Sequence, residues 1–208
     1  MSVQIYLITP PEFDPEDFRP KLIEALEAGE VACVQLRMKS KDGIPAPREE
    51  IKRTAEILMP EAQSRDVAFL INDDAELAAE IGADGVHVGQ EDMTAKQARQ
   101  IVGKDAIVGV TCHNSRHLAM EAAEHGADYV AFGAFYPTDT KNAKTQADPE
   151  ILEIWTTMTT VPCVAIGGIT AENAPPLIEA GAEFIAVISS VWDHPDGPGA
   201  AIKALNAL

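Results

Sequence analysis

The sequence lacks the features that would direct it to a membrane. No apolar run approaches the roughly 18 residues expected of a membrane-spanning helix. The N-terminal segment, MSVQIYLITPPEF, has no basic region leading into an apolar stretch, so it does not resemble a signal peptide. We interpret it as a first β-strand and expect no membrane partner.

Cysteine is scarce. Cys33, Cys112 and Cys163 are an odd number of widely spaced residues, with no CxxC or Cys/His pattern. This argues against a disulfide framework and against a zinc site. We expect reduced, half-buried thiols, which suits a cytoplasmic protein.

Basic residues are also few. Lys and Arg total 16 against 33 Asp and Glu, which gives a net charge of −17. A nucleic-acid-binding protein would show the opposite balance or a dense basic stripe, so we expect no nucleic-acid partner. If the ligand is an anion, the few basic residues should be concentrated where it binds.

A local pattern occurs three times in the chain. In each copy a helix ends in Gly, followed by Ala, an acid and an apolar strand; the copies are IGADGVHVG at 81–89, HGADYVAFG at 125–133 and AGAEFIAVI at 180–188. Gly suits the left-handed residue that closes a helix, and a continuous apolar run is typical of a buried parallel strand. The repeat therefore predicts alternating strands and helices.

Eight strands can be placed on this basis. We predict them at Val3–Thr9, Cys33–Arg37, Ala68–Asn72, Gly85–Val88, Ile107–Thr111, Tyr129–Gly133, Cys163–Ile166 and Phe184–Ile188, with helices between them, for example over 18–29 and 114–126. Such alternation fits a closed barrel or a doubly wound sheet. Even spacing and the lack of a GxGxxG turn favour a single (β/α)8 barrel domain over residues 1–208.

Polar residues recur where the predicted strands end, which in such a barrel is the face that carries the active site. In the second strand, alternation sends Gln35, Arg37 and Lys39 to the same side. The other strand ends carry Asn72-Asp73-Asp74, Gln90-Glu91-Asp92, Thr111-Cys112-His113-Asn114, Pro137-Thr138-Asp139-Thr140-Lys141, Gly167-Gly168 and Ser189-Ser190. Together these segments predict a polar site at one end of the barrel.

Helix capping competes with ligand binding at the acidic positions. Asp is a common N-cap, and we assign the cap of the helix after residue 74 to Asp74, which leaves Asp73 for a ligand. Thr94 is a better cap than Asp92 for the following helix.

The remaining polar residues also have structural alternatives. His87 lies in an apolar strand and is expected to be a packed core residue, whereas His113 fits a site or a loop equally well. A lone Ser189-Ser190 would usually be a cap. Gly167-Gly168 could be a plain turn, but glycine also lets a phosphate approach backbone N–H groups closely, and its place beside Ser189 matches a common barrel phosphate site.

The charges at these strand ends favour one chemistry. Arg37, Lys39 and Lys141 are cations in a chain that has few, so the ligand should carry several negative charges. Asp73 and Asp92 add carboxylates, and a small number of oxygen ligands is how proteins hold Mg²⁺ when phosphates complete its coordination. We predict a magnesium diphosphate substrate.

Seven segments resemble the thiamine-phosphate synthase (thiamine-phosphate pyrophosphorylase) family in order and interval. They are YLIT at 6–9, QLRMK at 35–39, INDD at 71–74, GADGVHVGQED at 82–92, PTDTK at 137–141, VAIGGIT at 164–170 and VISS at 187–190. The resemblance covers nearly the whole chain. It implies a cytoplasmic transferase that joins 4-amino-5-hydroxymethyl-2-methylpyrimidine diphosphate to 4-methyl-5-(2-hydroxyethyl)thiazole phosphate, releasing pyrophosphate by a dissociative mechanism.

The resemblance also implies residue roles. The pyrimidine diphosphate would be bound by Gln35, Arg37, Lys39 and Asn72, and Mg²⁺ by Asp73 and Asp92. The thiazole phosphate would be bound by Thr138 and Thr140, helped by Gly168, Ile188 and Ser189. Thr111 would meet the substrate, and Lys141 would reach the pyrophosphate. Arg37, Lys39 and Lys141 would act in catalysis.

The sequence departs from the family pattern at a few positions. Thr111 replaces a usual Ser, Ala134 stands where Pro is common, Glu150-Ile151 replaces an expected Gly-Leu, and SKDGIPAP at 40–47 is an insertion beside the site. The loop TDTKNAKT at 138–145 has no large apolar group to anchor it, so we expect it to act as a lid.

Two alternatives stay open at this stage. One is the related thiazole tautomerase, which would use His113 and have little need for Asp73 and Asp92. The other is a non-catalytic barrel that binds thiazole phosphate or thiamine phosphate. The sequence leaves open whether the chain forms a homodimer.

Overall fold

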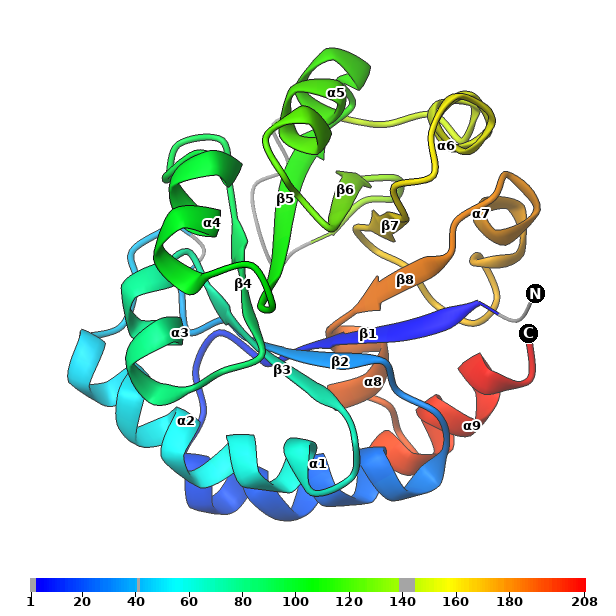
Figure 1. The fold of residues 1–208 in the computed structure, drawn as a ribbon. Helices are drawn as coiled ribbons and strands as arrows, with labels where there is room; N and C mark the ends of the chain where they lie inside the picture. Colours follow the sequence, from blue (N-terminus) through cyan, green and yellow to red (C-terminus); the bar gives the residue numbers. More distant parts are fainter. Residues whose placement is uncertain (1–2, 41, 139–144) are drawn as a thin grey trace.

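A closed barrel of parallel strands forms the centre of the molecule (Figure 1). The computed structural model describes residues 3–40, 42–138 and 145–208. Within these ranges the strands pair in sequence order, and β8 pairs with β1. They are β1 (Gln4–Ile8), β2 (Cys33–Leu36), β3 (Ala68–Asn72), β4 (Gly85–Val88), β5 (Ile107–His113), β6 (Tyr129–Gly133), β7 (Cys163–Ile166) and β8 (Phe184–Val187). The predicted (β/α)8 fold is confirmed.

Helices surround the barrel on its outside (Figure 1). They are α1 (Pro15–Ala28), α2 (Arg48–Gln63), α3 (Ala75–Ile81), α4 (Ala95–Val102), α5 (Arg116–Glu124), α6 (Glu150–Met158), α7 (Pro175–Glu179), α8 (Ser189–Trp192) and α9 (Pro198–Asn206). No helix in the described part of the chain combines the length and the apolar character needed to cross a membrane.

The strand boundaries agree closely with those predicted. The strand at β5 is the main difference, because it continues to His113, with a register shift against β6 between Thr111 and His113. A shift of this kind adds a residue to one strand and re-aims its side chains. It therefore changes which side chains of this strand end face the barrel mouth.

The threefold sequence repeat has a structural cause at the bottom of the barrel. In each copy the acid before an even-numbered strand accepts a hydrogen bond from the backbone N–H at or next to the start of the preceding odd-numbered strand. These bonds join Phe69 N to Asp84 (2.7 Å), Val108 N to Asp128 (2.7 Å) and Cys163 N to Glu183 (2.8 Å). The glycine two residues before each acid has positive φ, as a helix end requires. The repeat therefore ties neighbouring strands together at their amino ends.

Apolar side chains fill two regions separated by the strands. One lies between the strands and the helices and includes Leu22, Phe132 and Trp155. The other lies inside the barrel, where Ile8 and Leu70 are among the buried residues. The three cysteines are free and buried, not half-buried as expected from the sequence, because each lies within a strand, in β2, β5 and β7, and is packed among core side chains.

The predicted helix caps are confirmed. The Asp74 side chain accepts from the backbone N–H of Leu77 at 2.7 Å and so caps α3. Thr94 and Gln97 form a reciprocal capping box at the start of α4. Neither role requires Asp73 or Asp92, so both remain available to the barrel mouth.

Candidate active site

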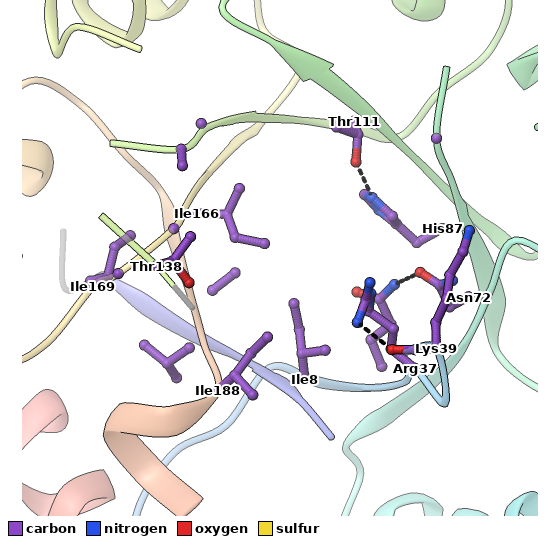
Figure 2. A pocket seen from close by; sticks show the side chains of 18 of the residues that line it. Ile8, Arg37, Lys39, Asn72, His87, Thr111, Thr138, Ile166, Ile169 and Ile188 are labelled. Carbon is purple, nitrogen blue, oxygen red and sulfur yellow. Dashed lines mark hydrogen bonds between the residues drawn. The ribbon is translucent and has the colours of Figure 1, made fainter. Parts of the chain in front are cut away.

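A pocket opens at the carboxyl ends of the strands, where the sequence predicts a site (Figure 2). Its lining includes the following predicted residues: Gln35, Arg37, Lys39, Asn72, Asp73, Asp92, Thr111, Thr138, Gly168, Ile188 and Ser189. Thr140 and Lys141 were also predicted, but they lie outside the described residues. The structure therefore brings together every predicted site residue that it describes.

Cationic side chains from the segment that directly follows β2 lie on one side of the pocket. The Lys39 ammonium donates to Asp73 Oδ2 at 2.7 Å. The Arg37 guanidinium donates to the Lys39 carbonyl at 3.3 Å, and both residues are labelled in Figure 2. Arg37 is 9% exposed. Burial lowers the pKa of the guanidinium, and the charge of Asp73 opposes this shift; an arginine nonetheless stays charged. This side of the pocket is therefore suited to an anion.

Two carboxylates, Asp73 and Asp92, meet beside these cations. Burial raises the pKa of Asp92, and the side chain of Asp73 raises it further through hydrogen bonding and charge. The backbone N–H of Gly89 donates to Asp92 Oδ2 at 3.0 Å and opposes that shift, as does the charge of Lys39. Asp73 has φ of 66°, a left-handed conformation that Asp tolerates better than most residues. Two like charges held this close favour a shared cation.

The donor set fits Mg²⁺. Among the described residues no group of three or more His, Cys, Asp or Glu side chains is arranged to hold a metal ion. Mg²⁺ is commonly bound through one or two carboxylates with phosphate oxygens and water completing the coordination. Asp73 and Asp92 are two carboxylates of that kind, and they line the pocket together with Arg37 and Lys39.

Glycine and hydroxyl groups form the opposite side of the pocket. Gly168 has φ of 64°, and a Cβ there would overlap the carbonyl oxygen of Pro137. The Gly168 carbonyl accepts from the Asn173 side chain at 2.9 Å, which fixes the turn. Thr138, which follows β6, and Ser189, which follows β8, also line the pocket, and β6 and β8 are the two neighbours of β7 in the barrel. Because any larger residue at 168 would push this segment away, the turn keeps backbone groups close to the pocket.

Apolar side chains separate the two sides. Ile8, Ile166 and Ile188 lie between the Arg37–Lys39 group and Thr138 in the close view (Figure 2). An apolar surface between two polar groups fits a ligand or ligand pair with a flat apolar centre and anionic ends.

Some lining residues were not expected from the sequence. Ile8, Ile166 and Ile169 look like ordinary strand or turn residues, and the period-2 pattern alone could have indicated which of them face inward. Thr145 also lines the pocket, and its carbonyl accepts from Ala134 N at 3.3 Å. The expectation that nothing anchors the loop 138–145 is therefore wrong at its C-terminal end, because a backbone hydrogen bond replaces the missing apolar anchor. Residues 139–144 lie outside the described part of the chain.

The two histidines that the sequence analysis considered, His87 and His113, both line the pocket. His87 is 8% exposed, as a core residue would be, but its ring nitrogens contact Tyr129 Oη at 2.9 Å and Thr111 Oγ1 at 2.8 Å. The view of His87 as a plain packed residue is therefore incomplete, because its strand position points it at the barrel interior. His113 lines the mouth with φ of 55°.

The insertion at 40–47 folds back beside Lys39. Lys39 and Pro45 form an antiparallel bridge, and Ala46 N donates to the Met38 carbonyl at 2.9 Å. The insertion therefore holds the backbone around Lys39, although residue 41 within it is not described.

The expected concentration of basic residues at the site is only partly correct. Arg37 and Lys39 are there, but other cations form ion pairs on the outer helices or at their ends, for example Arg48 with Asp74 and Arg65 with Glu27. These pairs offset part of the dense negative charge of the surface.

A closed parallel barrel with a polar pocket at its carboxyl mouth defines a (β/α)8-barrel enzyme. The family model described as thiamine monophosphate synthase matches residues 5–191. The thiamine-phosphate synthase of Rhodospirillum centenum is 63% identical over 99% of this chain and 97% of its own length, and that of Hyphomonas neptunium is 53% identical over 99% and 93%. The solved structure of thiamine phosphate pyrophosphorylase from Pyrococcus furiosus is 32% identical, covers 99% of this chain and 94% of its own, and has a TM-score of 0.83. The chain belongs to the thiamine-phosphate synthase family, whose members are transferases of thiamine biosynthesis.

Proposed function

We propose that the chain joins 4-amino-5-hydroxymethyl-2-methylpyrimidine diphosphate to 4-methyl-5-(2-hydroxyethyl)thiazole phosphate, giving thiamine phosphate and pyrophosphate. The observation that carries this proposal is the two-sided pocket: cations and paired carboxylates on one side, and a glycine turn with hydroxyl groups on the other. Two anionic substrates that react with each other need two anion sites facing one apolar space.

The pyrimidine diphosphate occupies the side formed by β2 to β5. Arg37 and Lys39 bind its diphosphate, Gln35 and Asn72 bind the ring, and Thr111 contacts the substrate. Asp73 and Asp92 would hold Mg²⁺, which would add positive charge beside the departing diphosphate. Lys141 is assigned to the pyrophosphate on family resemblance alone, since it lies outside the described residues.

The thiazole phosphate occupies the side formed by β6 to β8. Its phosphate is bound by Thr138 and Thr140, with the Gly168 turn and Ser189 facing it. Ile188 packs against the thiazole ring. A phosphate near backbone N–H groups and hydroxyls is a common arrangement in barrels of this type.

In this reaction the protein stabilises charge and positions the two substrates, and it supplies no nucleophile of its own. Diphosphate leaves first, and the thiazole nitrogen then attacks the pyrimidine cation. Arg37 and Lys39 stabilise the negative charge that develops on the leaving group, where it matters most in the transition state. The apolar side chains of Ile8 and Ile166 limit the access of water to the pyrimidine cation, which water would otherwise hydrolyse.

The rival tautomerase activity has one observation in its favour, the presence of His113 at the pocket. The Asp73–Asp92 pair favours the synthase, because an isomerisation without a leaving diphosphate has little use for two carboxylates beside Lys39. The cytoplasmic location and the single-domain organisation stay predictions, which cell fractionation and limited proteolysis would check. Size-exclusion chromatography would decide whether the chain forms a homodimer, which the sequence leaves open.

Substitutions on the two sides of the pocket test the proposal. Lys39→Ala should raise the KM for the pyrimidine diphosphate at least tenfold and leave the KM for the thiazole phosphate within about twofold, because one phosphate-bound cation contributes roughly 1.4 kcal/mol or more. Ser189→Ala should do the reverse, with a smaller effect. Initial rates of thiamine phosphate formation give both constants. Equal effects of each substitution on both substrates would overturn the two-sided assignment.

A further inference from the structure

A continuous chain of hydrogen bonds crosses the barrel interior beneath the pocket. Six side chains from six different strands form it, and both of its ends face the pocket. The bonds join Thr111 to His87 (2.8 Å), His87 to Tyr129 (2.9 Å), Tyr129 to Tyr6 (2.7 Å), Tyr6 to Gln35 (3.0 Å) and Gln35 to Asn72 (2.6 Å). Figure 2 shows one end, at Thr111 and His87, and the other, at Asn72.

The tyrosine hydroxyls set the direction of the chain. Tyr6 and Tyr129 are 3% and 7% exposed, and burial raises both of their pKa values well above the usual range. Each hydroxyl therefore keeps its proton and can donate one hydrogen bond only. Tyr6 donates to the Oε1 atom of Gln35. In the bond between the two tyrosines, Tyr129 must then be the donor.

The same counting continues to the end at Thr111. Because the proton of Tyr129 is used on Tyr6, the Nδ1 atom of His87 must donate to the Tyr129 oxygen. A neutral imidazole then has an acceptor at Nε2, and the Thr111 hydroxyl donates to it. The proton of Thr111 is thereby committed to His87, and its oxygen offers only lone pairs to the pocket.

At the other end the amides are fixed in turn. Gln35 accepts at Oε1, so its Nε2 atom donates to Asn72 Oδ1 at 2.6 Å. The oxygen of Asn72 is therefore occupied, and its amide nitrogen is left to donate into the pocket. All six members depend on one another, since reversing one bond would set two donors or two acceptors against each other in a buried place.

We propose that Tyr6, Tyr129 and His87 are positioning residues that fix the hydrogen-bonding polarity of the pyrimidine side of the pocket, with an acceptor at Thr111 and a donor at Asn72. This inference rests on the proposed function. An aminopyrimidine carries an amino group that donates and ring nitrogens that accept, so a pocket with one acceptor and one donor at fixed places matches it. A pocket with freely rotating hydroxyls and amides would select this ring less strongly.

The tautomer of His87 tests the direction without any substrate. The full chain is labelled with ¹⁵N-histidine, and long-range ¹H–¹⁵N correlation spectra distinguish protonated from unprotonated ring nitrogens; His87→Gln identifies the His87 signals by their loss. We expect a neutral ring with the proton on Nδ1. A neutral ring protonated on Nε2, or a doubly protonated ring, would overturn the proposal.

Tyr129→Phe tests the consequence for the reaction. Phenylalanine keeps the ring that stacks on His87 but removes the hydroxyl in the middle of the chain. We expect the KM for the pyrimidine diphosphate to rise about tenfold, as for the loss of a buried hydrogen bond, while the KM for the thiazole phosphate stays within about twofold. The proton on His87 should also lose its fixed place on Nδ1.

Trp155→Phe is the matched control. It removes another buried donor, the indole N–H that bonds the Val161 carbonyl at 2.7 Å, on α6 away from the chain. It should lower stability and leave the ratio of the two KM values unchanged. If Tyr129→Phe changes that ratio no more than the control does, the positioning role is wrong. Failure of the wild-type chain to make thiamine phosphate would instead refute the proposed function, and the His87 tautomer would still report the direction of the hydrogen bonds.

Discussion

Asp73 and Asp92 come from segments that follow neighbouring strands, and both are held near Lys39. A cation between them would relieve the repulsion that, with burial, raises the pKa of Asp92. The Lys39 ammonium already neutralises part of that charge through its 2.7 Å contact with Asp73. The charge of Lys39 also opposes the rise in the pKa of Asp92. We propose that the same ammonium binds phosphate once the substrate arrives.

Asp92→Asn should lower turnover at least tenfold, because it removes one of two charged metal ligands while keeping the size of the side chain. High Mg²⁺ concentration should restore part of the activity, since the remaining carboxylate still binds the ion weakly. Steady-state rates over a range of Mg²⁺ concentrations measure both effects. Unchanged turnover with an unchanged Mg²⁺ requirement would remove Asp92 from the site.

Asp74→Asn is the control for that substitution. It changes the neighbouring acid, which caps α3 and pairs with Arg48 at 3.1 Å. We expect the free energy of unfolding to fall by up to about 1 kcal/mol, with turnover and Mg²⁺ requirement nearly unchanged. A loss of turnover as large as that of Asp92→Asn would contradict the assignment of Asp74 to the helix cap and of Asp73 to the metal.

His113→Ala separates the synthase from the tautomerase. A dissociative reaction needs no strong general base, so synthase turnover should stay within roughly tenfold of wild type. A tautomerase would lose its proton-transfer group and most of its activity. Parallel assays with the synthase substrates and with a thiazole carboxylate phosphate give the comparison; loss of tautomer turnover in a chain that never forms thiamine phosphate would reverse the assignment.

At the scale of elements, acids that bond to strand backbones hold the amino end of the barrel together. Asp84 accepts from Phe69 N at 2.7 Å and from the Gln63 side chain at 3.1 Å, so it connects β3 to the end of α2. The active-site pocket lies at the opposite ends of the same strands. The contacts that stabilise the barrel and the residues that line the pocket thus lie at opposite ends of the strands, as is general for this fold.

Asp84→Ala should lower the free energy of unfolding by about 1–3 kcal/mol, because the backbone N–H of Phe69 loses its partner. The KM values should not change, since the pocket is at the other end of β3. Denaturant unfolding and initial rates measure the two quantities. Asp105→Ala, at an exposed acid before β5, is the control and should change neither; equal stability losses in both variants would show that the loss reflects charge and not the strand contact.

Across the whole molecule, the features that could be predicted from the sequence are those that depend on the pattern of neighbouring residues in one segment. The apolar runs located β3, β4, β6 and β7 to the residue, and alternation placed Gln35, Arg37 and Lys39 on the pocket side. What it missed depends on pairing between strands. The register shift in β5 and the hydrogen bond between His87 and Tyr129 arise from packing across the barrel, which no single segment encodes.

Turnover by the wild-type chain tests the central claim most directly. Purified protein is mixed with the pyrimidine diphosphate, the thiazole phosphate and Mg²⁺, and ³¹P NMR follows the phosphorus signals. We predict thiamine phosphate and pyrophosphate in equal amounts, formed only when both substrates are present, and little or no turnover after chelation of the metal. The account would be contradicted if neither product formed, or if the pyrimidine diphosphate were consumed while the thiazole phosphate stayed unchanged.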